Sequence, residues 1–286
     1  MTKKLLALYG LKWNPFAPEI PPDALLPTPK IEAFCWRIEQ GHVRDGGFAL
    51  ITGDSGTGKS VALRLLAERL TRVRDLTVGV IAHPQSHVAD FYREPGDVFG
   101  VALKPHNRWT GFKTLRAQWA AHLESTRLRP VLLIDEAQEM PALALSELRL
   151  LTSAHFDSRS LLSVVLAGDG RLPELFRREE LRPLGSRIRS RLTLEYASRE
   201  ELRACLEHLL TAAGNPSLMT AELMTTLCEH ALGNYRVLTT MADELLAVAA
   251  RRELSQLDEK LYLEVFAPPR SAAPAKTRRL SAEPHR

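Results

Sequence analysis

The segment GDSGTGKS, residues 53–60, follows the apolar run FALIT at 48–52 and precedes VALRLLAERL at 61–70. Its Gly-x4-Gly-Lys-Ser spacing, between an expected strand and an expected helix, satisfies the P-loop pattern. The glycines let the backbone curl so that successive N–H groups and the helix N-terminus face phosphate groups. The segment therefore predicts a nucleotide site, and the flanking strand and helix disfavour a chance glycine-rich turn.

Individual side chains of this segment carry specific expectations. Lys59 is expected to reach the β- and γ-phosphate oxygens, and Ser60 to ligate Mg²⁺. The residues expected to contact ATP here are Gly53, Asp54, Ser55, Gly56, Thr57, Gly58, Lys59, Ser60 and Val61.

A second motif lies in VLLIDE, residues 131–136, an apolar run that ends in two carboxylates. α/β sheets place their ligands at the C-terminal ends of such strands. We expect Asp135 to hold the Mg²⁺ shell and Glu136 to act as the general base that polarises the attacking water. An acidic cap at the start of the next helix is the structural alternative.

The order of apolar runs predicts an α/β fold with a parallel five-stranded sheet sandwiched by helices. Most of the runs lack polar alternation, as expected of strands covered on both faces. One strand separates the P-loop strand from the Asp-Glu strand in sequence, which indicates the additional-strand class of P-loop ATPases. The expected strands are 48–52, 76–82, 131–134, 162–167 and 191–196, and the expected helices between them are 60–70, 111–124, 142–154 and 172–180.

Beyond residue 197 the pattern becomes helical. Ser198 and Glu201 form a capping-box pattern, and Gly214 ends the helix that follows. Amphipathic segments at 220–231, 235–252 and 256–266 complete a small all-helical lid domain. The predicted organisation is an N-terminal arm and helix at 1–47, a P-loop ATPase domain at 48–197, the lid at 198–267 and a disordered basic tail at 268–286.

Composition places the chain among ordinary globular proteins, with 45% hydrophobic and 25% charged residues in 286. No run approaches the roughly 18 apolar residues of a membrane span, so we expect a cytoplasmic protein without a membrane partner. Three scattered cysteines suggest neither disulfides nor zinc. Residues 268–286 hold five Lys or Arg against one Glu, which accounts for the net charge of +4. This tail either touches DNA or is a solvated end.

Asp169 follows the expected strand 162–167, where related ATPases place a γ-phosphate sensor. An acidic side chain would repel the phosphate, so Asp169 could instead orient water, bind a neighbouring base or serve as a turn residue.

Arginines form two further candidates. Within RPLGSRIRSR, residues 182–191, Arg187 and Arg191 are predicted to reach the γ-phosphate of a neighbouring subunit as an arginine finger; a solvated basic face is the alternative. Arg236, in GNYR at 233–236, opens a lid helix and is predicted to sense ATP; its alternative is a surface arginine.

In this order, the motifs resemble those of an AAA+ ATPase over most of residues 30–265. More narrowly, YGLKWNPF at 9–16, GDSGTGKS, LLIDEAQEM with its Gln138, and SRIRSRLTLEY look like the ExeA-type ATPases of secretion, pilus and transposon systems. The resemblance implies that Asn14, Pro15 and Phe16 sit against the adenine, although Phe16 could equally be core packing. Asp169 departs from the amide or hydroxyl expected at its position.

The sequence ends where long ExeA-type secretion proteins continue into a membrane helix, and its last helix resembles that of short transposon-encoded ATPases related to IstB and TnsC. That resemblance implies an ATP-dependent homo-oligomer, a ring or a filament, that assembles on duplex DNA, recruits a transposase and disassembles on hydrolysis. The runner-up is a cytoplasmic ATPase for type II secretion or pilus assembly. A switch that binds ATP and barely hydrolyses it is disfavoured by Glu136 and Arg187.

Basic residues interleaved with Trp109 after the second strand provide the predicted DNA surface. Such a pattern suits phosphate contact without base recognition, and binding would depend strongly on salt. A solvated loop and helix over a packed Trp109 is the alternative. The predicted DNA-contacting residues are Lys104, Arg108, Lys113 and Arg116.

Overall fold

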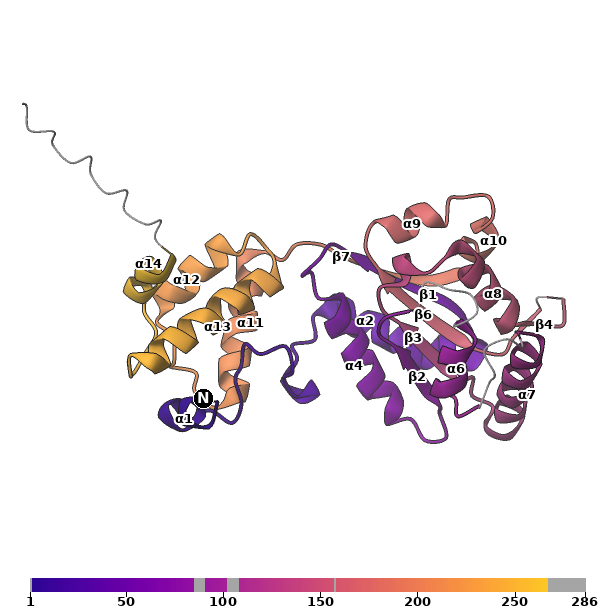
Figure 1. Cartoon of the computed structure of the whole chain (residues 1–286), viewed down its shortest axis with the longest axis horizontal. Helices are drawn as coiled ribbons and strands as arrows, with labels where there is room; N and C mark the ends of the chain where they lie inside the picture. The colour runs from indigo at the N-terminus through magenta and orange to yellow at the C-terminus, as the bar shows by residue number, and fades with distance from the viewer. Residues whose placement is uncertain (1, 85–90, 102–107, 157, 267–286) are drawn as a thin grey trace, which may run out of the picture.

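The computed structural model describes residues 2–84, 91–101, 108–156 and 158–266. A parallel sheet flanked by helices occupies one part of the molecule, and a cluster of C-terminal helices occupies the other (Figure 1). Among the described residues, none of the helices has the length and apolar character that crossing a bilayer requires.

The main sheet has five parallel strands in the order β2-β3-β6-β1-β7. Its strands are β1 (Gly47–Gly53), β2 (Val78–Ile81), β3 (Val131–Ile134), β6 (Ser163–Gly168) and β7 (Ile188–Leu194). The predicted parallel five-stranded sheet is confirmed. Because β6 lies between β1 and β3, the carboxyl ends of these three strands, which carry the P-loop, Asp169 and Asp135, meet at one edge.

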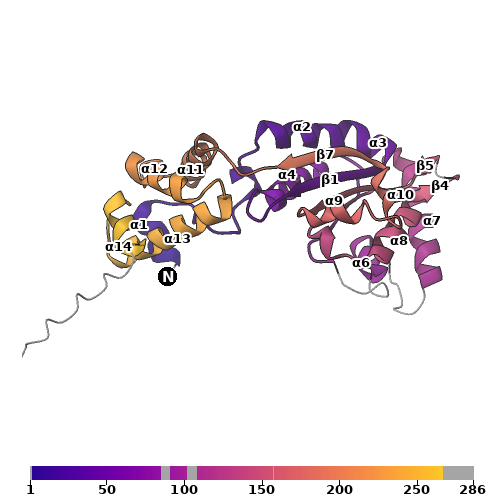
Figure 2. The ribbon, with the colours of Figure 1, turned by 90° about the horizontal axis from the view of Figure 1, so that it is seen from above.

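Alternate strand residues feed two separate cores, as the two-residue period of a strand requires. Phe48, Leu50 and their equivalents in β3 and β6 pack against α6 (Arg93–Val98), α7 (Arg108–Thr126) and α8 (Ala142–Thr152). Ala49, Ile51 and their equivalents pack against α2 (Pro29–Arg37) and α4 (Lys59–Thr71). Figure 2 shows α2 on one side of β1 and β7, and α6 and α8 on the other.

One expected helix is shorter than the sequence indicated. Instead of a helix over 172–180, α9 spans Arg171–Leu175, and turns lead to α10 (Arg182–Gly185). Phe176 and Leu181 are both buried in the same core. Five residues apart on a continuous helix they would lie about 140° apart, so the helix ends to bury both.

Several short elements have no counterpart in the expected strands and helices. These are α1 (Thr2–Tyr9), η1 (Pro22–Ala24), α3 (Val43–Asp45), α6, η3 (Ala137–Glu139), α10 and the antiparallel hairpin of β4 (Ser153–Ala154) and β5 (Arg159–Ser160). The expected N-terminal helix corresponds to α2 and its continuation η2 (Ile38–His42).

The helical part comprises α11 (Arg199–Ala213), α12 (Ala221–His230), α13 (Tyr235–Arg251) and α14 (Glu259–Phe266). The capping box of Ser198 and Glu201 is present, and Gly214 ends α11 with φ 106°. These helices share one core that also includes Tyr9, Leu11 and Phe16. The start of the N-terminal arm therefore packs on the C-terminal helices, whereas α2 packs on the sheet.

Candidate nucleotide site

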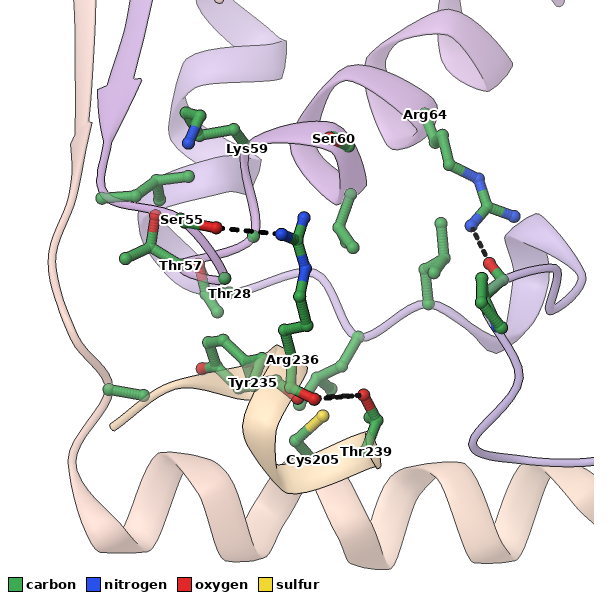
Figure 3. A pocket seen from close by; sticks show the side chains of 18 of the residues that line it. Thr28, Ser55, Thr57, Lys59, Ser60, Arg64, Cys205, Tyr235, Arg236 and Thr239 are labelled. Carbon is green, nitrogen blue, oxygen red and sulfur yellow. Dashed lines mark hydrogen bonds between the residues drawn. The ribbon is translucent and has the colours of Figure 1, made fainter. Parts of the chain in front are cut away.

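A cavity of about 840 Å³ lies where the carboxyl edge of the sheet meets the helical part (Figure 3). The P-loop from Ser55 to Val61 lines it together with Glu136 and Asp169. Pro15 and Phe16 of the arm and Arg236 of α13 line it as well. The cavity thus collects residues from motifs that are far apart in the sequence.

The P-loop turns between β1 and α4, and its carbonyl groups are already occupied. Lys59 Nζ donates to the carbonyl oxygens of Gly53 (2.9 Å) and Asp54 (3.0 Å), and Thr57 Oγ1 donates to that of Asp54 (2.8 Å). Lys59 is 8% exposed. The Thr57 N–H also donates to the Asp54 carbonyl oxygen, at 3.4 Å. The other loop N–H groups and the N-terminus of α4 are the natural donors for an anion.

Ser60 in the first turn of α4 and Asp135 after β3 meet, although they are far apart in the sequence. Ser60 Oγ donates to Asp135 Oδ2 at 2.8 Å, and the other carboxylate oxygen accepts from the Glu136 N–H at 2.9 Å. A hydroxyl beside a carboxylate is the hard-oxygen pair that P-loop proteins offer to Mg²⁺. The two residues predicted as metal ligands therefore fit the ion.

Glu136 has a left-handed backbone, with φ 48° and ψ 37°. Its carboxylate accepts a hydrogen bond from Gln138 Nε2. Gln138 is 8% exposed, and its Oε1 accepts from the N–H of Asp169 at 3.2 Å. Non-glycine residues in this conformation cluster at functional sites. Gln138, which entered the sequence analysis only as a family match, ties the predicted base to the end of β6.

Asp169 lines the cavity but does not act alone. Arg171 Nε donates to Asp169 Oδ2 at 2.9 Å, and Arg171 Nη2 also bonds Glu139 Oε1 at 2.7 Å. The Arg171 guanidinium holds the pKa of the Asp169 carboxyl below its usual range. The negative charge that made a phosphate sensor doubtful is thus countered by Arg171, a residue that sequence reasoning missed. The signal was present two residues away in the same turn.

The lid reaches the P-loop through Arg236, whose Nη1 donates to Ser55 Oγ at 2.9 Å (Figure 3). The structure therefore brings Arg236 of the GNYR motif to the cavity, and its role in sensing ATP stays a prediction. Two neighbours in that motif, Asn234 and Tyr235, also contact the loop.

The arm is bonded both to α13 and to α4. Asn14 Nδ2 donates to Asp243 Oδ1 at 2.7 Å, while Asn14 Oδ1 accepts from the Phe16 N–H at 3.0 Å. Phe16 is 4% exposed, so it is a core residue and also lines the cavity. Arg64 of α4, not singled out from sequence, donates to the carbonyl oxygens of Pro18 and Ile20 and fastens the arm beside the P-loop.

Arg187 and Arg191 do not line the cavity of their own chain. Arg187 Nη1 donates to the Pro183 carbonyl, and Arg191 Nη2 to that of Gly185 at 3.4 Å. A role as arginine finger would have to be exerted on a neighbouring copy and stays a prediction.

The predicted DNA-contacting residues that the structure describes differ in the contacts they make. Lys104 lies outside the described residues, and Arg108 is placed only as the first residue of α7. Lys113 Nζ lies 4.6 Å from the ring centroid of Trp109, which is 65% exposed. Arg116 Nη1 instead donates to the carbonyl oxygens of Leu150 (2.9 Å) and Leu151 (3.1 Å), and so caps the end of α8.

Comparisons with known proteins agree with this architecture. A family model described as AAA domain matches residues 42–176. The ORC2 protein of Aeropyrum pernix superposes with a TM-score of 0.69 at 16% identity, covering 88% of this chain and 70% of ORC2. Domain III of the Thermotoga maritima replication initiation protein DnaA gives 0.62 at 16% identity, covering 87% and 96%. The fold is therefore the AAA+ P-loop fold, with the P-loop at the carboxyl edge of the sheet.

In sequence, the chain is 30% identical over 249 residues to general secretion pathway protein A of Aeromonas hydrophila. The match covers 85% of this chain and 44% of that protein, so the chain spans less than half the length of its relative. This similarity supports an AAA+ ATPase of the ExeA type.

Proposed function

We propose that this chain binds ATP with Mg²⁺ in the cavity between the sheet and the helical part, and that hydrolysis drives the remodelling of a protein assembly of the secretion or pilus type. The observation that carries the proposal is that Lys59, Ser60 and Glu136 line one cavity and that Ser60 is bonded to Asp135. The similarity to general secretion pathway protein A supports the protein-assembly role.

The residues divide the proposed chemistry among them. Lys59, which bonds the carbonyl oxygens of Gly53 and Asp54, would bond phosphate oxygens in their place. Ser60 and Asp135 would hold the Mg²⁺, which would neutralise charge on the phosphates. Glu136, oriented by Gln138, accepts the proton of the attacking water. Arg187 of a neighbouring copy would stabilise the transition-state charge.

A second candidate is regulation of DNA transposition, in which the chain assembles on duplex DNA and recruits a transposase. The observation that favours it is the exposed Trp109 ring with the Lys113 ammonium over it. An aromatic beside a cation is a common element of nucleic-acid contact.

One experiment tests the proposal and separates the two candidates. Phosphate release by the full chain is measured with Mg²⁺ and ATP, with and without duplex DNA, at two salt concentrations. The protein-assembly role predicts turnover that DNA leaves unchanged, and absence of turnover under all conditions contradicts the proposal. Stimulation by DNA that is lost at high salt and in Lys113→Glu supports the second candidate.

A further inference from the structure

The first turn of α13 lies directly on the P-loop. Asn234 Nδ2 donates to the Ser55 carbonyl oxygen at 2.9 Å, across 179 positions of sequence. The Tyr235 N–H donates to the Gly56 carbonyl oxygen at 3.0 Å. These bonds reach the backbone of the loop, whereas Arg236 reaches only the Ser55 hydroxyl.

Asn234 also begins α13. Its Oδ1 accepts from the N–H groups of Arg236 (3.0 Å) and Val237 (3.1 Å), which makes it the N-cap residue. Serine, threonine and aspartate can accept these bonds too, but only a carboxamide also offers an amide donor at its far end. A single side chain therefore fixes the start of the lid helix and the P-loop backbone together.

Gly56 shows how close this approach is. Its φ is 82°, and a Cβ at this position would lie 2.0 Å from Asn234 Oδ1. A side chain at residue 56 would push the lid off the loop. Three features therefore favour glycine at residue 56. They are its left-handed backbone, the approach of the lid, and the approach of the nucleotide that the P-loop motif implies.

The bonds from the lid act on the peptide groups that are expected to bind phosphate. The Ser55 carbonyl belongs to the same peptide unit as the Gly56 N–H, and the Gly56 carbonyl to the same unit as the Thr57 N–H. Donation to a carbonyl polarises its peptide unit and strengthens the N–H as a donor. With Lys59 on Gly53 and Asp54, the carbonyl groups of four consecutive loop residues are engaged.

We propose that Asn234 is a positioning residue that couples the lid to the P-loop, so that the lid strengthens ATP binding and bound ATP strengthens the hold on the lid. The reciprocity follows because any coupling between two binding events acts equally on both. This inference rests on the proposed function, namely that ATP binds in this cavity.

The test compares the full-length wild type with Asn234→Ser and Asn234→Asp. Both replacements retain a good N-cap acceptor, and neither has the amide that donates to Ser55. We expect unchanged helix content by circular dichroism without nucleotide. Calorimetric titration with ATP and Mg²⁺ should give a Kd about three- to tenfold weaker in both variants, the range for one hydrogen bond. The KM for ATP should rise by the same factor, with kcat nearly unchanged.

Two outcomes would overturn the inference, and a third would contradict the proposed function. Wild-type ATP affinity in Asn234→Ser would overturn the inference, even if Asn234→Asp binds weakly, because the aspartate effect would then be one of charge. A kcat loss without a change in Kd would overturn it as well. Absence of ATP binding by the wild type would instead contradict the proposed function on which the inference rests.

Discussion

The floor and the roof of the nucleotide cavity differ in how the sequence encodes them. The floor consists of the P-loop (53–60) with Asp135 and Glu136, and its residues are contiguous in sequence or follow the ends of β1 and β3, which β6 separates. The roof consists of arm residues 15–20 and the first turn of α13, which meet the floor only through tertiary packing. We therefore expect the floor to supply the chemistry and the roof to adjust how tightly the ligand is held.

The largest effect is expected when the predicted general base is removed from the floor, which tests the division of roles most strongly. Glu136→Gln should lower ATP turnover by about 10²–10⁴-fold, the usual contribution of general acid–base catalysis. ATP binding should persist, because the loop and Lys59 are intact. Phosphate release and calorimetry measure the two effects, with the exposed Glu174→Gln as the matched control. Turnover equal to wild type would remove Glu136 from the catalytic role.

A smaller effect is expected from the roof. Arg236→Ala removes a guanidinium that bonds Ser55 Oγ and that we expect to turn to the phosphates. ATP affinity should fall by about tenfold, as for a hydrogen bond to a charged group, and ADP affinity by less. Arg251→Ala at the other end of α13 is the control. If Arg236→Ala instead lowered turnover as much as Glu136→Gln does and left ATP affinity unchanged, Arg236 would take part in the chemistry. The distinction between floor and roof would then be wrong.

A still smaller effect is expected from Arg171, which bonds Asp169 at the edge of the cavity. Arg171→Ala leaves the Asp169 carboxylate without its guanidinium partner beside the phosphate position. We expect ATP affinity about two- to fivefold weaker from this exposed pair, and restoration when Asp169→Asn is added. Equilibrium titration of the three variants, with Arg178→Ala as control, gives the comparison. Failure of Asp169→Asn to restore affinity would show that Arg171 acts on the ligand directly.

His42 does not line the cavity, and we expect it to affect the stability of the fold and not ATP binding. It is 5% exposed and lies 2.9 Å from Ser190 Oγ under β7, where burial and then the charge of Arg189 lower its pKa to about 4. The unfolded chain, with a histidine pKa near 6.5, binds a proton that the folded chain rejects. Stability is therefore full above pH 6.5 and is lost as the pH falls toward 4, by about 2 kcal/mol at pH 5.

Urea unfolding at pH 7 and pH 5 measures this dependence. His42→Gln should reduce the loss between the two values without changing ATP affinity at pH 7. The exposed His230→Gln is the control and should keep the wild-type dependence. An equal loss in His42→Gln and wild type would assign the acid sensitivity to other groups.

The sheet and the floor could be predicted from sequence because their signals are local. Apolar runs predicted the five strands, and the GDSGTGKS and VLLIDE patterns predicted Lys59 and Ser60 at the start of a helix and Asp135 at the end of a strand. Even the lid helices followed from caps and periodicity, with α11 starting and ending at its capping box and Gly214.

The roof contacts could not be predicted in this way. That Asn234 would reach Ser55, or that Arg64 would bond the arm at Pro18 and Ile20, depends on how separate segments pack. Nor did the sequence indicate that Arg116, a basic residue of the predicted DNA surface, would bond the carbonyl groups at the end of α8. Lone charged residues carry no local sign of which partner they find.

The central claim is that one ATP is held by the floor and the roof together. Hydrogen exchange of the full chain with and without ATP and Mg²⁺ tests it directly. The account predicts slower exchange in the presence of ATP at both the N-terminal turn of α4 and the first turn of α13, including the Tyr235 amide. Slower exchange at α4 alone, with α13 unchanged, would contradict it.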